Sequence, residues 1–66
     1  MEKVNNNVSM LRSQKGVTQE DMAKAVGVTR QTIIAIEKGN YTPSVLLAIK
    51  IAQYFQIPVE EVFSLS

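Results

Sequence analysis

The chain has 66 residues and a formal net charge of +1, and it contains neither cysteine nor histidine. This length suffices for a single domain, residues 1–66, and the missing residue types exclude disulfides and thiolate- or imidazole-held metals. So small a net charge argues against a uniformly basic surface that coats nucleic acid. We expect no metal, no cofactor and no small-molecule ligand.

The N-terminal segment 1–7 is polar where a secretory signal needs an apolar stretch. The longest apolar run, residues 45–49, is too short to span a bilayer. We therefore expect a cytoplasmic protein that does not use a membrane.

Glycines, prolines and capping residues divide the chain into five expected helices, which predicts an all-α fold. The first helix is expected from Asn6 to Lys15, ending at Gly16, with Val8, Leu11 and Lys15 on one stripe.

The second helix is expected to begin at Thr18, whose hydroxyl can cap it, with Asp21 as the acid of a capping box. Its inward residues are Met22, Ala23 and Val26, and Gly27 ends it.

A third helix is expected from Thr29 to Gly39, with Ile33 and Ile36 facing the core. The turn at Gly27 and Val28 is too short for the second and third helices to pack antiparallel, so they must cross steeply. Residues 18–38 are therefore interpreted as a helix-turn-helix, which exposes one helix as a ridge that fits the DNA major groove.

The fourth helix is expected to have Thr42 as its cap and Pro43 at its first position, where a missing N–H costs nothing. Its expected core stripe is Val45, Ala48, Ile51, Ala52 and Phe55. The fifth helix is expected from Pro58 and offers Val59, Val62 and Phe63.

At about 100° per residue, the outer face of the third helix carries Arg30, Gln31, Ile34 and Lys38. Arginine can donate twice to guanine and glutamine can pair twice with adenine, so Arg30 and Gln31 are the predicted base readers. Ile34 either meets a thymine methyl group or is partly buried by a neighbour.

Several polar side chains flank this face and are predicted to contact the DNA backbone. They are Gln19, Thr29, Thr32, Lys38, Asn40 and Tyr41. For Lys38, the favourable interaction of a cation with a helix C-terminus is the alternative explanation.

The stretches 18–23 and 26–39 resemble the helix-turn-helix of the lambda-repressor/Cro-like (Xre-type) regulators, and residues 41–44, 48–52 and 59–63 continue the pattern. Minimal stand-alone repressors of the cytolysin-operon type are the most similar kind. The resemblance implies double-stranded DNA as partner, and a homodimer that represses from a palindromic operator. It also implies an ion pair between Arg12 and Glu37, and terminal segments 2–5 and 63–65 that pair as a short β-ribbon. Ala35 departs from the family pattern, because some relatives carry near this position a longer polar side chain that contacts the DNA bases.

The fourth helix has more apolar residues than one core stripe needs, which predicts a partner surface. Candidates for a dimer interface are Leu46, Leu47, Ile49, Val59, Val62 and Phe63. The alternative is a protein-interaction module, antitoxin-like or a co-regulator, that docks a different protein on this helix. An enzyme is not expected, because the acid pairs at 20–21 and 60–61 diverge around their helices and no nucleophile and base can be assembled.

Overall fold

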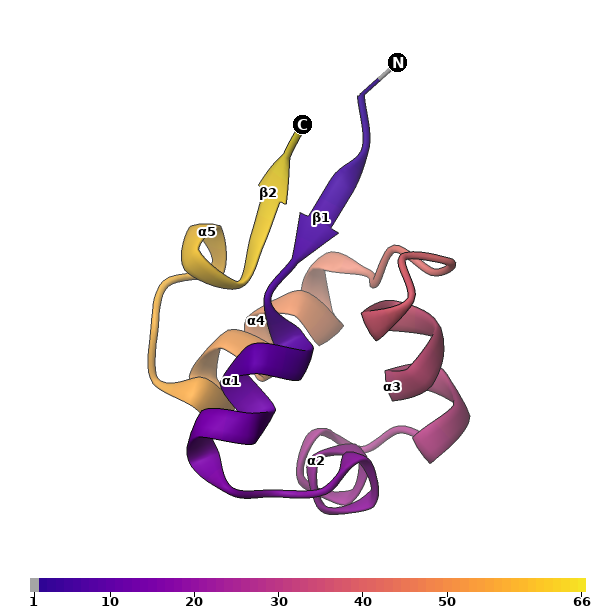
Figure 1. Ribbon diagram of the computed structural model, residues 1–66, viewed down its shortest axis with the longest axis vertical. Helices are drawn as coiled ribbons and strands as arrows, with labels where there is room; N and C mark the ends of the chain where they lie inside the picture. Colours follow the sequence, from indigo (N-terminus) through magenta and orange to yellow (C-terminus); the bar gives the residue numbers. More distant parts are fainter. Residues whose placement is uncertain (1) are drawn as a thin grey trace.

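The computed structural model describes residues 2–66, which form five helices and two short strands. In chain order they are β1 (Val4–Asn6), α1 (Val8–Lys15), α2 (Gln19–Val26), α3 (Arg30–Glu37), α4 (Val45–Phe55), α5 (Val59–Val62) and β2 (Phe63–Leu65). The helices pack into one body, and the two strands rise from it as a ribbon that carries both chain ends (Figure 1). The predicted all-α, five-helix fold with a terminal ribbon is confirmed.

All five helices contribute to one apolar core, which closes the small body without any buried polar side chain among residues 2–66. The buried residues are Val8, Met22, Ala23, Val26, Ile33, Ile36, Leu47, Ile51, Ala52 and Val62. Each helix buries one stripe and leaves the opposite side to solvent, as expected of amphipathic helices around a shared centre. Within the same residues no helix is long and apolar enough to cross a membrane.

The two strands pair antiparallel, with Val4 opposite Leu65 and Asn6 opposite Phe63. The first strand begins two residues later than the predicted segment 2–5 and ends one residue later, so Asn6 belongs to it. The Asn6 side chain donates to the Ile36 carbonyl (2.8 Å) and accepts from the Val8 amide (3.1 Å). The first helix therefore begins two residues after the approximate start predicted at Asn6, because pairing with Phe63 and the long-range hydrogen bond to Ile36 hold Asn6 in the strand.

Of the three residues predicted to share the inward face of α1, only the two apolar ones face the core. Val8 is buried and Leu11 packs against the core, whereas Lys15 is exposed. The Lys15 ammonium lies 5.0 Å from the centroid of the Tyr54 ring, a cation–π distance. Lys15 therefore covers the edge of the core with its stem and keeps its charge in water.

The predicted capping box at the start of α2 is present. The Thr18 hydroxyl accepts from the Asp21 amide (3.0 Å), and the Asp21 carboxylate accepts from the Thr18 amide (3.0 Å). Hydrogen bonding by Thr18, first of all by its backbone amide, favours the ionised carboxylate and lowers the pKa of Asp21, with a smaller contribution from the charge of Lys24.

Replacing Asp21 by asparagine should make the stability of the protein less sensitive to acid. Because the pKa of Asp21 is lower in the folded chain, its charge stabilises the fold above its unfolded pKa. That contribution disappears as pH falls through the folded pKa, so the gap in unfolding free energy between wild type and Asp21→Asn should close at low pH. Urea unfolding followed by circular dichroism at several pH values measures this gap. Glu20→Gln is the control, since it removes a charge from the same turn and leaves both cap hydrogen bonds.

The start and the buried face of α4 differ from the prediction. Ser44, not Thr42, is the cap, and its hydroxyl accepts from the Leu47 amide (3.2 Å). The core stripe runs through Leu47 and Ile51, whereas Val45 is 77% exposed. Thr42 and Ser44 are both good capping residues, so local chemistry left the choice open. Packing decided it, because the observed helix rotation buries the larger Leu47 in place of Val45.

Candidate nucleic-acid interface

A tight turn sets the angle between α2 and α3. Gly27 ends α2 in the left-handed conformation (φ 78°), which glycine adopts without strain. The Val28 amide then bonds to the Ala23 carbonyl (2.9 Å), and the Val28 side chain packs against the core. Thr29 caps α3 directly afterwards. Two helices joined this closely must cross, as a helix-turn-helix requires.

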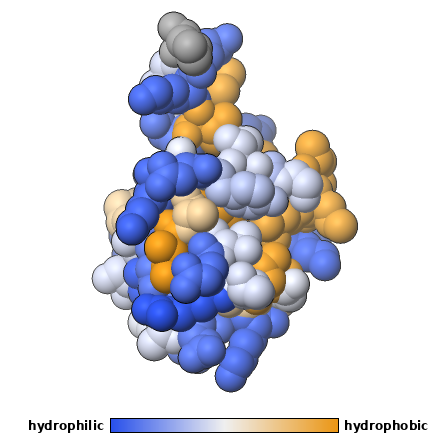
Figure 2. Space-filling view, turned by 90° about the vertical axis from the view of Figure 1, so that its right-hand side faces the viewer, coloured by the Kyte–Doolittle hydropathy of each residue, from blue (hydrophilic) through white to orange (hydrophobic). Residues whose placement is uncertain are grey.

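The orientation of α3 follows from its two buried residues. Ile33 and Ile36 anchor the helix in the core, so Arg30 and Gln31 in the first turn are exposed. Figure 2 shows the molecule from the side on which α3 lies in Figure 1, and this face is largely hydrophilic, with smaller apolar areas. The structure thus places the two predicted base readers on an outward face that solvent, or a DNA groove, can reach.

Ile34 is half-buried, as is Ala35 beside it. The exposed part of Ile34 lies on the same helix face as Arg30, one turn further along. Partial burial, one of the two interpretations of Ile34, is therefore observed, and contact with a thymine methyl group stays a prediction.

The hydroxyl groups of Thr29 and Thr32 hydrogen-bond to each other at 3.1 Å. The Thr29 hydroxyl also accepts from the Thr32 amide (3.3 Å), which caps α3. A hydroxyl pair contains two hydrogens and uses one between its members, so one hydrogen remains free to donate. The two threonines therefore offer a single outward donor at the start of α3.

An ion pair joins α1 to α3, as the family resemblance implied. Arg12 Nε donates to Glu37 Oε2 at 2.9 Å, and Arg12 Nη1 donates to the Val17 carbonyl at 3.2 Å. The hydrogen bond to Glu37 raises the pKa of Arg12. Gln19 enters the same network, since its Nε2 donates to Glu37 Oε1 at 3.1 Å. Glu37 thus fixes the side-chain amide of Gln19 at the start of α2.

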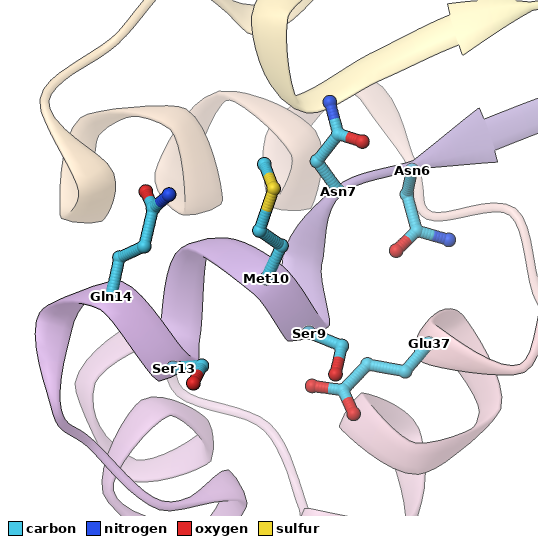
Figure 3. Close-up of a pocket in the computed structure, with 7 residues that line it drawn as sticks. All are labelled: Asn6, Asn7, Ser9, Met10, Ser13, Gln14 and Glu37. Carbon is cyan, nitrogen blue, oxygen red and sulfur yellow. The ribbon is translucent and has the colours of Figure 1, made fainter.

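Two shallow depressions lie on either side of this ion pair and differ in charge. One is lined by Arg12, Gly16, Val17, Thr18, Gln19, Glu20 and Arg30, so two guanidinium groups and one carboxylate border it and its net charge is positive. The other is lined by Asn6, Asn7, Ser9, Met10, Ser13, Gln14 and Glu37, with Glu37 pointing toward Ser9 (Figure 3). Glu37 carries the only charge of that second group, which disfavours an anion. The first depression is the one that suits a phosphate.

Lys38, Asn40 and Tyr41 follow α3 and are all exposed. They leave the helix through a loop in which Gly39 has φ 79° and the Asn40 amide bonds to the Ala35 carbonyl (2.9 Å). The structure therefore groups the predicted backbone contacts at both ends of α3. The threonines lie at its start, the Gln19 side chain is held against Glu37 in its last turn, and Lys38, Asn40 and Tyr41 lie beyond its end.

The structure separates the predicted interface residues of α4 and α5 into two sets. Leu46 and Ile49 are 66% and 46% exposed and adjoin the exposed Val45. Leu47 and Val62 belong to the protomer's own core, so predicting them as interface residues is wrong. Val59 and Phe63 are partly buried against that core and offer little surface. The error in α4 has the same origin as the error in its core stripe, namely the rotation of the helix.

Two hydrogen bonds at this site were not predicted from the sequence. The bond from Gln19 to Glu37 spans 18 positions, and the bond from Asn6 to Ile36 spans 30. A polar Asn5–Asn7 tract before a helix gives no signal for a strand tied to a distant helix end. Such contacts depend on which helix ends meet, and residue spacing does not encode that.

Comparison with known proteins agrees with this geometry. The chain matches the helix-turn-helix family over residues 8–62. It is 53% identical over 58 residues to an uncharacterised HTH-type transcriptional regulator of Methanocaldococcus jannaschii, covering 88% of each chain. It is 33% identical over 54 residues to the transcriptional repressor RstR of the cryptic phage CTXphi of Vibrio cholerae, covering 82% of this chain and 49% of RstR. Among solved structures, the restriction-modification controller protein C.AhdI of Aeromonas hydrophila superposes with a TM-score of 0.78 at 29% identity, covering 83% of each chain.

The crossed helix pair with an exposed first turn on α3 defines a helix-turn-helix DNA-binding protein. The chain belongs to the Xre-type helix-turn-helix family of transcriptional regulators. Its relatives and its fold are those of DNA-binding regulators and not of enzymes.

Proposed function

We propose that this protein binds a specific inverted-repeat operator as a homodimer, by inserting α3 into the DNA major groove, and that it represses transcription. The observation that carries the proposal is the exposure of Arg30 and Gln31 in the first turn of a helix anchored by Ile33 and Ile36. The first turn of a recognition helix is the part that reaches the base edges.

The chemistry of the face assigns a role to each side chain. Arg30 can donate twice to guanine, Gln31 can pair with adenine, and the exposed edge of Ile34 can meet a thymine methyl group. Gln19, Lys38, Asn40 and Tyr41 and the threonine hydroxyl pair contact phosphates and set the register of the helix in the groove. Glu37 supports the register because it holds Gln19 in place.

A second copy of the chain supplies the second recognition helix. Val45, Leu46 and Ile49, here named the α4 apolar patch, are exposed side by side on one face of α4. Burying this patch against its own copy in a two-fold dimer removes apolar area from water. A two-fold dimer also presents two recognition helices to half-sites about 34 Å apart.

Repression follows from occupancy of a promoter, because a bound dimer blocks the polymerase in the cytoplasm where the DNA lies. RstR, a relative whose name describes a transcriptional repressor, supports this direction over activation.

Fluorescence anisotropy with the duplex upstream of the protein's own gene, against a scrambled duplex, tests the proposal. We expect tight binding to the native duplex by two chains per site, and a loss of about 1 to 3 kcal/mol per half-site for Arg30→Ala or Gln31→Ala. Gln53→Ala, an exposed glutamine on α4, is the matched control and should bind like wild type.

Equal, weak binding to both duplexes that neither substitution changes would contradict base readout by α3. The α4 apolar patch would then favour the alternative, a module that docks a different protein. Salt separates the two functions, since operator binding weakens steeply with ionic strength and an apolar interface does not.

A further inference from the structure

We propose that a cleft between β1 and the loop after α3 binds a phosphate of the DNA backbone, with Lys3 and Lys38 as its cations. This proposal rests on the DNA-binding function proposed above and extends the contact surface to the N-terminal strand. The cleft is lined by Glu2, Lys3, Val4, Asn5, Lys38, Gly39 and Thr42.

Lys3 directly precedes β1, and backbone hydrogen bonds hold it to the C-terminal residue. The Lys3 amide donates to the Ser66 carbonyl (3.3 Å), and the Ser66 amide donates to the Lys3 carbonyl (3.0 Å). Further along β1, the Asn6 side chain donates to the carbonyl of Ile36 at the end of α3 (2.8 Å). Lys3 is therefore presented from a hydrogen-bonded segment next to a strand docked beside α3, which lowers the entropy lost when it binds.

The charge balance of the cleft favours an anion. Its lining contributes two lysines and one acid, Glu2. The Glu37 carboxylate next to Lys38 in sequence is already engaged by Arg12 and Gln19. Within residues 2–66, Arg12 and Glu37 form the single ion pair, so both lysines keep their charge available.

The position of the cleft identifies DNA as the source of the phosphate. The Lys3–Lys38 cleft lies beyond the end of α3, because Lys38 and Gly39 follow that helix directly. The eight residues of α3 span about 12 Å at 1.5 Å per residue. The major groove is about 12 Å wide and is bordered by two phosphate backbones. A lysine just beyond the end of a helix that lies in this groove can therefore reach one of the two backbones.

Anisotropy measurements over a range of salt concentrations test the cleft with the operator duplex. Lys3→Gln should weaken binding by about threefold to fivefold for each chain, equally for the native and scrambled duplexes. It should also make the negative slope of log K against log salt shallower by about one for each chain, since one phosphate contact is lost. Lys3→Arg should retain affinity. Glu2→Gln should bind more tightly, because it removes the only acid of the cleft.

Lys50→Gln is the matched control. Lys50 is an exposed lysine that lines a depression with Lys24, between α2 and α4, to which α3 contributes no residue. Its loss changes the net charge of the protein by the same amount and should leave the salt slope nearly unchanged. Titration with inorganic phosphate, followed at the Gly39 amide by NMR, separates a free-anion site from a DNA-backbone site.

If Lys3→Gln and Lys50→Gln have the same affinity and the same salt slope, the cleft is not a DNA contact. Saturation by inorganic phosphate with no effect of Lys3→Gln on DNA binding overturns the proposal as well. In both cases Arg30→Ala still abolishes the preference for the operator, so the proposed function stands. If neither Lys3→Gln nor Arg30→Ala changes binding and the native duplex is not preferred, the cleft and the proposed function are both overturned.

Discussion

Replacing Ile33 by alanine is expected to leave the protein largely unfolded or close to it. Ile33 is fully buried and is one of the two side chains that anchor α3 in the core. Truncating a buried isoleucine to alanine costs about 2 to 5 kcal/mol, from lost burial and from the cavity that remains. A single core of this size rarely supplies more than about 5 kcal/mol of stability. Urea unfolding of both proteins at equal chain concentration measures the loss.

Ile34→Ala is the matched control because it makes the same chemical change at the next position of the same helix. Ile34 is half-buried and faces outward, so its truncation should cost less than about 1 kcal/mol of folding free energy. The two variants should therefore separate stability from recognition. A similar loss of unfolding free energy in both would contradict the orientation of α3 and, with it, the assignment of Arg30 and Gln31 to the outward face.

Replacing Leu46 by glutamate should convert the proposed dimer into a monomer and weaken operator binding by a factor of about 10² to 10⁴. Leu46 is 66% exposed, so the change should leave the protomer folded. In a dimer that buries the α4 apolar patch, the same change places two charges near the two-fold axis without partners, which is costly. The affinity falls so far because binding to the second half-site no longer benefits from a tethered partner.

Sedimentation equilibrium gives the mass of the variant, and anisotropy gives its affinity for the operator duplex. Gln53→Glu introduces the same charge at another exposed position of α4 and should behave like wild type. If Leu46→Glu keeps the wild-type mass and affinity, the two-fold interface lies elsewhere on the molecule. A wild-type protein that is monomeric both free and on DNA would contradict the proposed homodimer itself.

The helix-turn-helix could be predicted because its signals are local. Thr18 with Asp21, the turn at Gly27 and Val28, and the cap at Thr29 specify their own conformations within a few residues. The apolar period of α3 then separates Ile33 and Ile36 from Arg30 and Gln31 without reference to the rest of the chain. The outward face of the candidate site therefore follows directly from the sequence.

Local signals were ambiguous at α4, and there the prediction failed. Thr42 and Ser44 are both capping residues, and Val45, Leu46, Leu47 and Ile49 are all apolar, so the sequence permits more than one helix start and more than one buried face. The choice depends on how the side chains of α4 fill the space left by the other helices, and the structure buries Leu47. The same packing removed Leu47 and Val62 from the predicted interface.

The class of this protein, and α3 with its exposed face, could be predicted from the residues alone, because caps, turns and helical periodicity act over a few residues. The tertiary structure alone decided the rotation of α4, the link of Gln19 to Glu37, and the docking of β1 by Asn6 that brings Lys3 beside Lys38. These features join segments far apart in the chain. Their geometry follows from close packing of the whole core, which fixes positions that no single segment specifies.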